Sequence, residues 1–179
     1  MEPTSRSPYV VGPLPGFTPA VGHLVSMMNY VRMTTLRAVE GLGVGALDHL
    51  LDGDANSIGM LLEHAACVEE WYQEATLGIT FDEEARTRRK LGADLGQPAR
   101  EAIRGRGLDA YLRRLGDVRR VTLKGLADRD DAWLFEESRW GDDVSNNYFK
   151  WFHVFEDELN HRGQIRIIRR RLPPELRPA

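Results

Sequence analysis

Hydrophobic residues recur at helical intervals along four stretches of the chain, and alternation typical of strands is scarce. The stretches run from about residues 20 to 40, 58 to 77, 108 to 127 and 145 to 172. Four amphipathic helices in a chain of 179 residues predict an all-α fold, an antiparallel four-helix bundle. The predicted inward positions are Leu24, Met27, Met28, Val31 and Ala38; Leu61, Ala65, Val68, Tyr72 and Ala75; Leu112, Leu115, Val118 and Leu126; and Tyr148, Phe152, Phe155, Leu159, Ile165 and Ile168. Aromatic residues at helical spacing, interpreted mainly as core, are Trp71, Tyr72, Tyr148 and Trp151.

Residues with special backbone preferences delimit these helices. Asn56 or Ser57 can cap the start of the second helix, and Gly78 is suited to its end. Pro173 and Pro174 forbid continuation of the last helix, because proline lacks the amide hydrogen and clashes with the preceding turn. The helix boundaries are therefore predicted by local chemistry as well as by the hydrophobic period.

Two connections between the helices are long. Residues 82–106 are polar, basic and interrupted by glycine and proline, which predicts short helices and loops. Roughly 17 residues separate the third helix from the fourth, more than bundles usually need, and favour a long connection that crosses over or covers a pocket. We divide the chain into an N-terminal extension (1–19), the bundle (20–172) and a C-terminal tail (173–179).

The composition of the chain indicates which classes of partner and which cellular compartment to expect. The formal net charge is −3 with both signs dispersed, so no nucleic acid or anionic membrane is expected as a partner. The arginines at 166 and 169–171 are interpreted as residues favoured at a helix C-terminus, rather than as a nucleic-acid patch. One cysteine cannot form an internal disulfide, and no apolar run has the length of a signal peptide or membrane span. These features predict a cytoplasmic protein.

The densest set of metal-binding residue types lies near the end of the chain. His153, Asp157 and His161 recur at intervals of four, so they lie near one face of the last helix. Consecutive members drift by about 40° around the helix, and two neighbours can therefore bind one ion better than three. Asp157 and His161 form one such pair, and His64, next to the apolar stripe of the second helix, is the best third ligand. Three protein ligands would leave a coordination position open.

These residues also admit ordinary structural roles. A single histidine is more often a hydrogen-bonded residue than a metal ligand, and an Asp/His pair four residues apart is common on helix surfaces. Cys67, three residues after His64, could be a fourth ligand, a redox thiol or a buried small hydrophobe, the commonest fate of a free cysteine. Periodicity alone leaves the metal site open.

Two motifs resemble a known superfamily. The segment from His153 to Ile165, with histidines separated by multiples of four and then Arg-Gly-Gln, resembles the last-helix signature of the DinB/YfiT-like superfamily. The segment from Met60 to Tyr72 is similar to the second helix of that superfamily, whose histidine is a metal ligand. The resemblance covers about residues 20 to 172.

The resemblance implies a set of site residues. The metal ligands fall on His64, Asp157 and His161, although many members have histidine in place of Asp157. A branch resembling mycothiol-dependent maleylpyruvate isomerase has a carboxylate there, as glutamate. Two histidines and a carboxylate suit Zn²⁺, Ni²⁺, Fe²⁺ or Mn²⁺. The expected pocket residues or residues that orient the ligands are His153, Glu158, Gln164 and Cys67.

The resemblance also implies a function. Several members resemble thiol S-transferases that use bacillithiol or mycothiol, so we expect a metal-dependent enzyme that activates a low-molecular-weight thiol for S-transfer. A metal-dependent hydrolase needs the same residues and is one alternative. A non-catalytic, stress-related binding protein with a vestigial metal site is the other. A homodimer is common in proteins that resemble this family.

Overall fold

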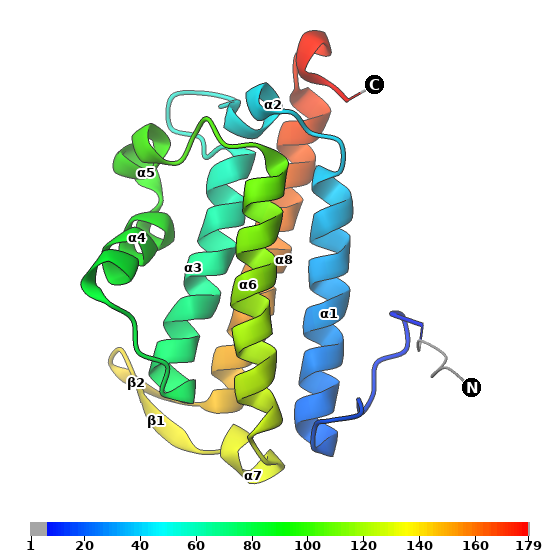
Figure 1. The fold of residues 1–179 in the computed structure, drawn as a ribbon, viewed down its shortest axis with the longest axis vertical. Coiled ribbons are helices and arrows are strands. Elements are labelled where there is room, and N and C mark those ends of the chain that lie inside the picture. Colours follow the sequence, from blue (N-terminus) through cyan, green and yellow to red (C-terminus); the bar gives the residue numbers. More distant parts are fainter. Residues whose placement is uncertain (1–6, 179) are drawn as a thin grey trace.

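The computed structural model describes residues 7–178 and is mostly helical, which confirms the expected all-α class (Figure 1). The four long helices are α1 (Pro19–Val39), α3 (Ile58–Leu77), α6 (Leu108–Ala127) and α8 (Asn147–Arg171). The shorter helices are α2 (Val44–Asp48), α4 (Glu83–Asp94), α5 (Gly96–Ala102), α7 (Asp131–Leu134) and the 3₁₀ helix η1 (Pro174–Leu176).

The four long helices lie side by side, with α1 and α3 each packed against both α6 and α8 (Figure 1). Their bounds agree with the sequence-based prediction to within two residues. Ser57 caps α3, its hydroxyl accepting a hydrogen bond of 3.2 Å from the Met60 amide. Gly78 ends α3 in the left-handed conformation at φ 73°, where a residue with a Cβ would be strained.

The connection between α6 and α8 contains an element that the hydrophobic pattern did not predict. After α7, the strands β1 (Glu137–Trp140) and β2 (Asp143–Asn146) pair antiparallel as a hairpin, with Trp140 opposite Asp143. Every residue of β1 is exposed, so the strand carries no alternation of buried and exposed positions for sequence analysis to detect. The Trp140 indole donates a 3.3 Å hydrogen bond to the Tyr72 hydroxyl, which ties the hairpin to α3.

Some predicted core positions are wrong. Phe152 and Leu159 of α8 are exposed, whereas Trp151 and Val154 are buried. At this turn of α8 the inward position is filled by Trp151, which was also expected in the core, and not by Phe152. On α3, Ala75 and Trp71 are also exposed, and the Trp71 ring lies against the guanidinium of Arg89 instead of the core.

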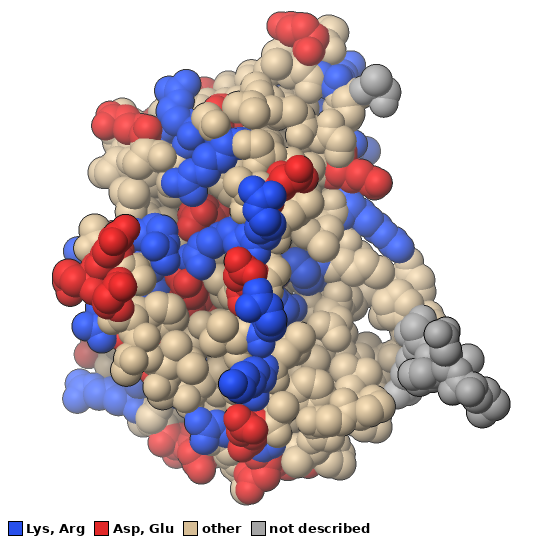
Figure 2. Space-filling model, in the orientation of Figure 1, with Lys and Arg blue, Asp and Glu red and all other residues tan. Residues whose placement is uncertain are grey.

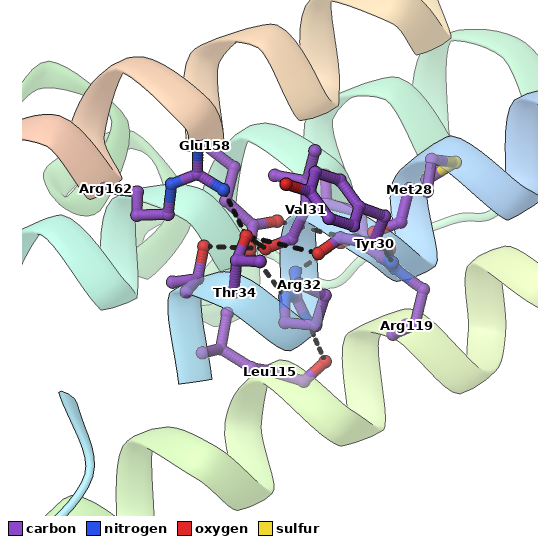
Figure 3. A network of polar contacts seen from close by, with 11 residues as sticks. Met28, Tyr30, Val31, Arg32, Thr34, Leu115, Arg119, Glu158 and Arg162 are labelled. Atoms are coloured by element: carbon purple, nitrogen blue, oxygen red, sulfur yellow. Dashed lines mark hydrogen bonds and ion pairs between the residues drawn. The ribbon is translucent and has the colours of Figure 1, made fainter. Parts of the chain in front are cut away.

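The core consists of two apolar clusters separated by charged residues. Each long helix contributes a buried charged side chain to a layer between the two clusters: Arg32, Glu69, Arg119 and Glu158. Both arginines contact both carboxylates, at nitrogen–oxygen distances of 2.9, 3.0, 2.7 and 3.6 Å. Figure 3 labels Arg32, Arg119 and Glu158 of this charged layer. Arg32 also donates to the main-chain carbonyl of Leu115, and Arg119 to that of Met28.

The surface charge is mixed. On the face that carries α6, basic and acidic side chains alternate over short distances (Figure 2). Within residues 7–178, no helix has the length and apolar character that crossing a membrane requires.

Candidate metal centre

Three of the predicted ligands meet at the seam between α3 and α8. The Nε2 atom of His64 lies 3.4 Å from Oδ2 of Asp157, and the Nε2 atom of His161 lies 3.4 Å from Oδ1 of the same carboxylate. The two imidazole rings pack edge to face with their centroids 4.6 Å apart. One ligand atom from each of the three residues can be chosen so that all lie within 4.8 Å of one another.

These separations fit ligands around a cation. They are longer than the 2.7–3.2 Å of ordinary hydrogen bonds to nitrogen. Ligands about 2.1 Å from a tetrahedral ion are about 3.4 Å apart, which matches both nitrogen–oxygen distances. In addition, Oδ2 of Asp157 and Nδ1 of His161 are buried without a hydrogen-bond partner. The donor set, its spacing and these unsatisfied atoms are compatible with one divalent metal.

The electrostatics of the site keep its carboxylate charged. Burial opposes ionisation of Asp157, but His161 and His64 outweigh it and hold the pKa of that carboxyl well below its usual range. Burial alone would lower the pKa of His64. The Asp157 carboxylate, together with hydrogen bonds to the main chain, outweighs burial and raises this pKa. Asp157 therefore remains an anionic oxygen donor, and protons compete for the His64 nitrogen.

A main-chain carbonyl orients His64. The Nδ1 atom of His64 lies 3.0 Å from the carbonyl oxygen of Gly92, in α4. A carbonyl can only accept, so Nδ1 of His64 donates to it, and in the neutral ring this leaves Nε2, the nitrogen nearest Asp157, available to a metal. The sequence could not predict this contact, because any residue at that position supplies the same carbonyl.

The remaining predicted site residues lie in different surroundings. His153 is partly buried, and its Nδ1 is 3.1 Å from Oε2 of Glu156. Glu158 is buried in the charged layer and pairs with Arg32 and Arg119. Gln164 is exposed and lines a separate hollow beside the 51–56 segment.

Cys67 is fully buried, in keeping with its interpretation as a small hydrophobe. Burial and the neighbouring Glu63 charge raise the pKa of the Cys67 thiol to about 12. The group therefore stays protonated at neutral pH, and it does not belong to the cluster of His64, Asp157 and His161.

An aromatic rim lies about one helical turn from Asp157, and of its four residues only His153 was named as an expected pocket residue. It consists of Tyr72, Trp140, Phe149 and His153. The Tyr72 and His153 rings are 6.1 Å apart. Burial raises the pKa of Tyr72, and the charge of Asp157 adds to the effect.

Comparison with known proteins assigns the family. The family model of mycothiol S-transferases matches residues 23–173. The chain belongs to this family. The mycothiol S-transferases are DinB-like, so the resemblance inferred from the two motifs is confirmed. The matched region contains all three candidate metal ligands. Membership of the mycothiol S-transferase family relates this protein to thiol chemistry. No curated protein matches the chain significantly.

Proposed function

We propose that this protein is a metal-dependent S-transferase that activates a low-molecular-weight thiol for attack on an electrophile. The observation that supports the proposal most strongly is the convergence of His64, Asp157 and His161 from two helices in a member of the mycothiol S-transferase family. We further propose that the four long helices form the antiparallel four-helix bundle expected from the sequence.

The proposed ligands suit this chemistry. Two imidazole nitrogens and one carboxylate oxygen bind Zn²⁺, Ni²⁺, Fe²⁺ or Mn²⁺ and leave coordination positions for a small molecule. A divalent metal bound there would lower the pKa of a coordinated thiol and raise the thiolate fraction at neutral pH. Asp157 would offset one unit of the metal charge, while the Gly92 carbonyl holds the His64 ring in the binding orientation.

The reaction that follows is a nucleophilic substitution. The thiol sulfur forms a new bond to the electrophilic carbon, the leaving group departs with the bonding electron pair, and the thiol proton passes to solvent. The aromatic rim beside Asp157 would hold the apolar part of the substrate. Mycothiol is the first thiol to test because the family takes its name from it, and bacillithiol is the second.

The test is a conjugation assay. The protein is stripped of metal with a chelator, reloaded with Zn²⁺ or Ni²⁺, and incubated with an alkyl halide and mycothiol, bacillithiol or glutathione. We expect turnover that requires both metal and thiol, loss of turnover in Asp157→Ala, and retention in Cys67→Ala, whose thiol is buried away from the three ligands.

Two outcomes would favour the alternatives. Hydrolysis of ester or amide substrates without any thiol would favour a metal-dependent hydrolase. A protein that binds no metal after careful reconstitution, and conjugates nothing, would favour a binding protein with a vestigial site.

A further inference from the structure

Five arginines from three elements surround one hollow at the C-terminal end of α8. The hollow has a volume of about 660 Å³ and is lined by Arg37, Ala38, Arg166, Arg169, Arg170 and Arg177. Arg37 comes from α1, three of the others from α8, and Arg177 follows η1. Arg166, Arg169 and Arg170 lie at i, i+3 and i+4, so one helix face directs all three to the same side. We call this feature the arginine hollow.

None of the five arginines forms an ion pair with a carboxylate of residues 7–178. Three of them donate to neutral oxygens: Arg37 to the Tyr9 hydroxyl, Arg169 to the Ala38 carbonyl and Arg177 to the Leu172 carbonyl. By contrast, two arginines of α4 and three of α6 pair with a carboxylate, as Arg86 does with Glu74. The arginine hollow therefore concentrates positive charge in a protein whose net charge is −3.

The negative ends of the helix dipoles do not neutralise the positive charge of the arginine hollow. The C-termini of α1 and α8 each carry the equivalent of roughly half a negative charge. Glu40 and Glu175 are the nearest acidic residues in sequence, and neither forms an ion pair. Together these groups offset about three of the five positive charges, so the sequence-based interpretation as helix-end arginines accounts for only part of the cluster.

We propose that the arginine hollow binds a small molecule carrying two or more phosphate or carboxylate groups. Guanidinium groups present paired donors that match the oxygens of both groups, and their charge persists at every physiological pH. A volume of about 660 Å³ is that of a small-molecule site. Glu40, three residues after Arg37, and Glu175, two residues before Arg177, are exposed and would repel a long polyanion or a flat anionic surface.

The hollow is separate from the candidate metal centre. Its residues on α8 begin five positions after His161, and none of the three metal-site residues lines it. The proposal is therefore independent of the proposed transferase activity, and each can fail without the other.

The test is calorimetric titration of the full-length protein at low ionic strength, with pyrophosphate and citrate as separate probes. We expect saturable binding of at least one probe, which identifies the preferred oxyanion, and weakening when salt is added. Arg166→Gln/Arg170→Gln should reduce the affinity at least about tenfold. These two side chains make no hydrogen bond within the described chain, so the variant should keep its folding temperature and its metal content.

The matched control is Arg104→Gln/Arg113→Gln, which removes two exposed charges that do not line the hollow and should leave binding unchanged. Absence of binding by the unsubstituted protein, or equal weakening in both double variants, would overturn the proposal. So would tighter binding of an RNA oligonucleotide or of anionic vesicles that is lost in the Arg166/Arg170 variant, because the ligand would then be a macromolecule or membrane.

Discussion

Single residues decide whether the α3–α8 seam can hold a metal. Asp157 lies between His64 and His161, and each of its oxygens faces a different imidazole. The carboxylate is one methylene shorter than the glutamate found in a related branch, yet both nitrogen–oxygen distances are 3.4 Å. The shorter side chain therefore still reaches both histidines.

The first prediction separates the histidines of α8. His161→Ala removes one of the three ligands and should weaken Zn²⁺ binding at least about 100-fold, more than the loss of a supporting residue would. His153→Ala should leave most binding intact, because His153 pairs with Glu156 instead of facing the other ligands. Metal titration followed by elemental analysis measures both. Equal loss in the two variants would mean that the ligand pair is assigned incorrectly.

The second prediction concerns Gly92. A Cβ at this position would lie 2.5 Å from the sulfur of Cys67, so Gly92→Ala should displace α4 and the carbonyl that orients His64. We expect weaker metal binding, by about 10-fold or more, in the same titration. Adding Cys67→Ala removes the clashing sulfur and should restore the affinity. Unchanged binding in the single variant would show that the His64–Gly92 contact does not support the site.

Side-chain chemistry could be predicted from the sequence at this scale, but main-chain contacts could not. The spacing of Asp157 and His161 and the position of His64 on its helix made the three residues candidates, and the family resemblance then implied that they are ligands. The Gly92 carbonyl has no residue signature, and no sequence pattern indicated that Glu158 faces the core, where it pairs with Arg32 and Arg119.

At the scale of helices, the charged layer links all four long elements. Arg32, Glu69, Arg119 and Glu158 come from α1, α3, α6 and α8, and together they carry two positive and two negative charges. Glu158 directly follows Asp157, so its pairing also constrains the rotation of α8 that directs Asp157 and His161 towards α3.

The third prediction tests this layer. Glu69→Gln leaves one buried positive charge uncompensated and should lower the free energy of unfolding by about 3–5 kcal/mol. Asp117→Asn, which breaks the exposed pair with Arg120, should cost less than about 1 kcal/mol. Urea denaturation measures both. Similar losses of unfolding free energy in the two variants would show that the buried layer stabilises the fold no more than a surface ion pair does.

The pH dependence of stability follows from the same residue. Burial raises the pKa of Glu69, but Arg119 and Arg32 outweigh it and hold the pKa below its usual value. The group therefore stabilises the fold above its unfolded pKa, and this stabilisation is lost as the pH falls below that value. When the pH is lowered from 7 to well below about 4, the unfolded pKa of a glutamate, the unsubstituted protein should lose more unfolding free energy than Glu69→Gln. Parallel losses in the two proteins would contradict the assignment.

Elements with a buried face could be predicted from the sequence, and those without one could not. The four long helices bury apolar stripes, and their bounds were predicted to within two residues. The β1–β2 hairpin is exposed along β1 and left no periodic signal, although the length of its connection indicated that something lay there. Phe152 was placed inside because the period alone cannot distinguish it from Trp151, which fills the core.

For the whole molecule, the arrangement of the helices brings the candidate ligands together. The two ends of the core are apolar, the charged layer lies between them, and the metal-site residues occupy the same middle region of α3 and α8. The mycothiol S-transferase match spans this entire region, from residue 23 to residue 173. His64 and Asp157 are almost one hundred residues apart in the sequence. Their meeting could therefore be expected from a family resemblance but not from the local pattern of residues.

The most direct test of the central claim is a crystal structure of the zinc-loaded protein with anomalous diffraction measured at the zinc absorption edge. We predict one anomalous peak at the α3–α8 seam, about 2.0–2.2 Å from a nitrogen of His64, a nitrogen of His161 and an oxygen of Asp157. A peak elsewhere, or His64 turned away from an empty seam, would contradict the account.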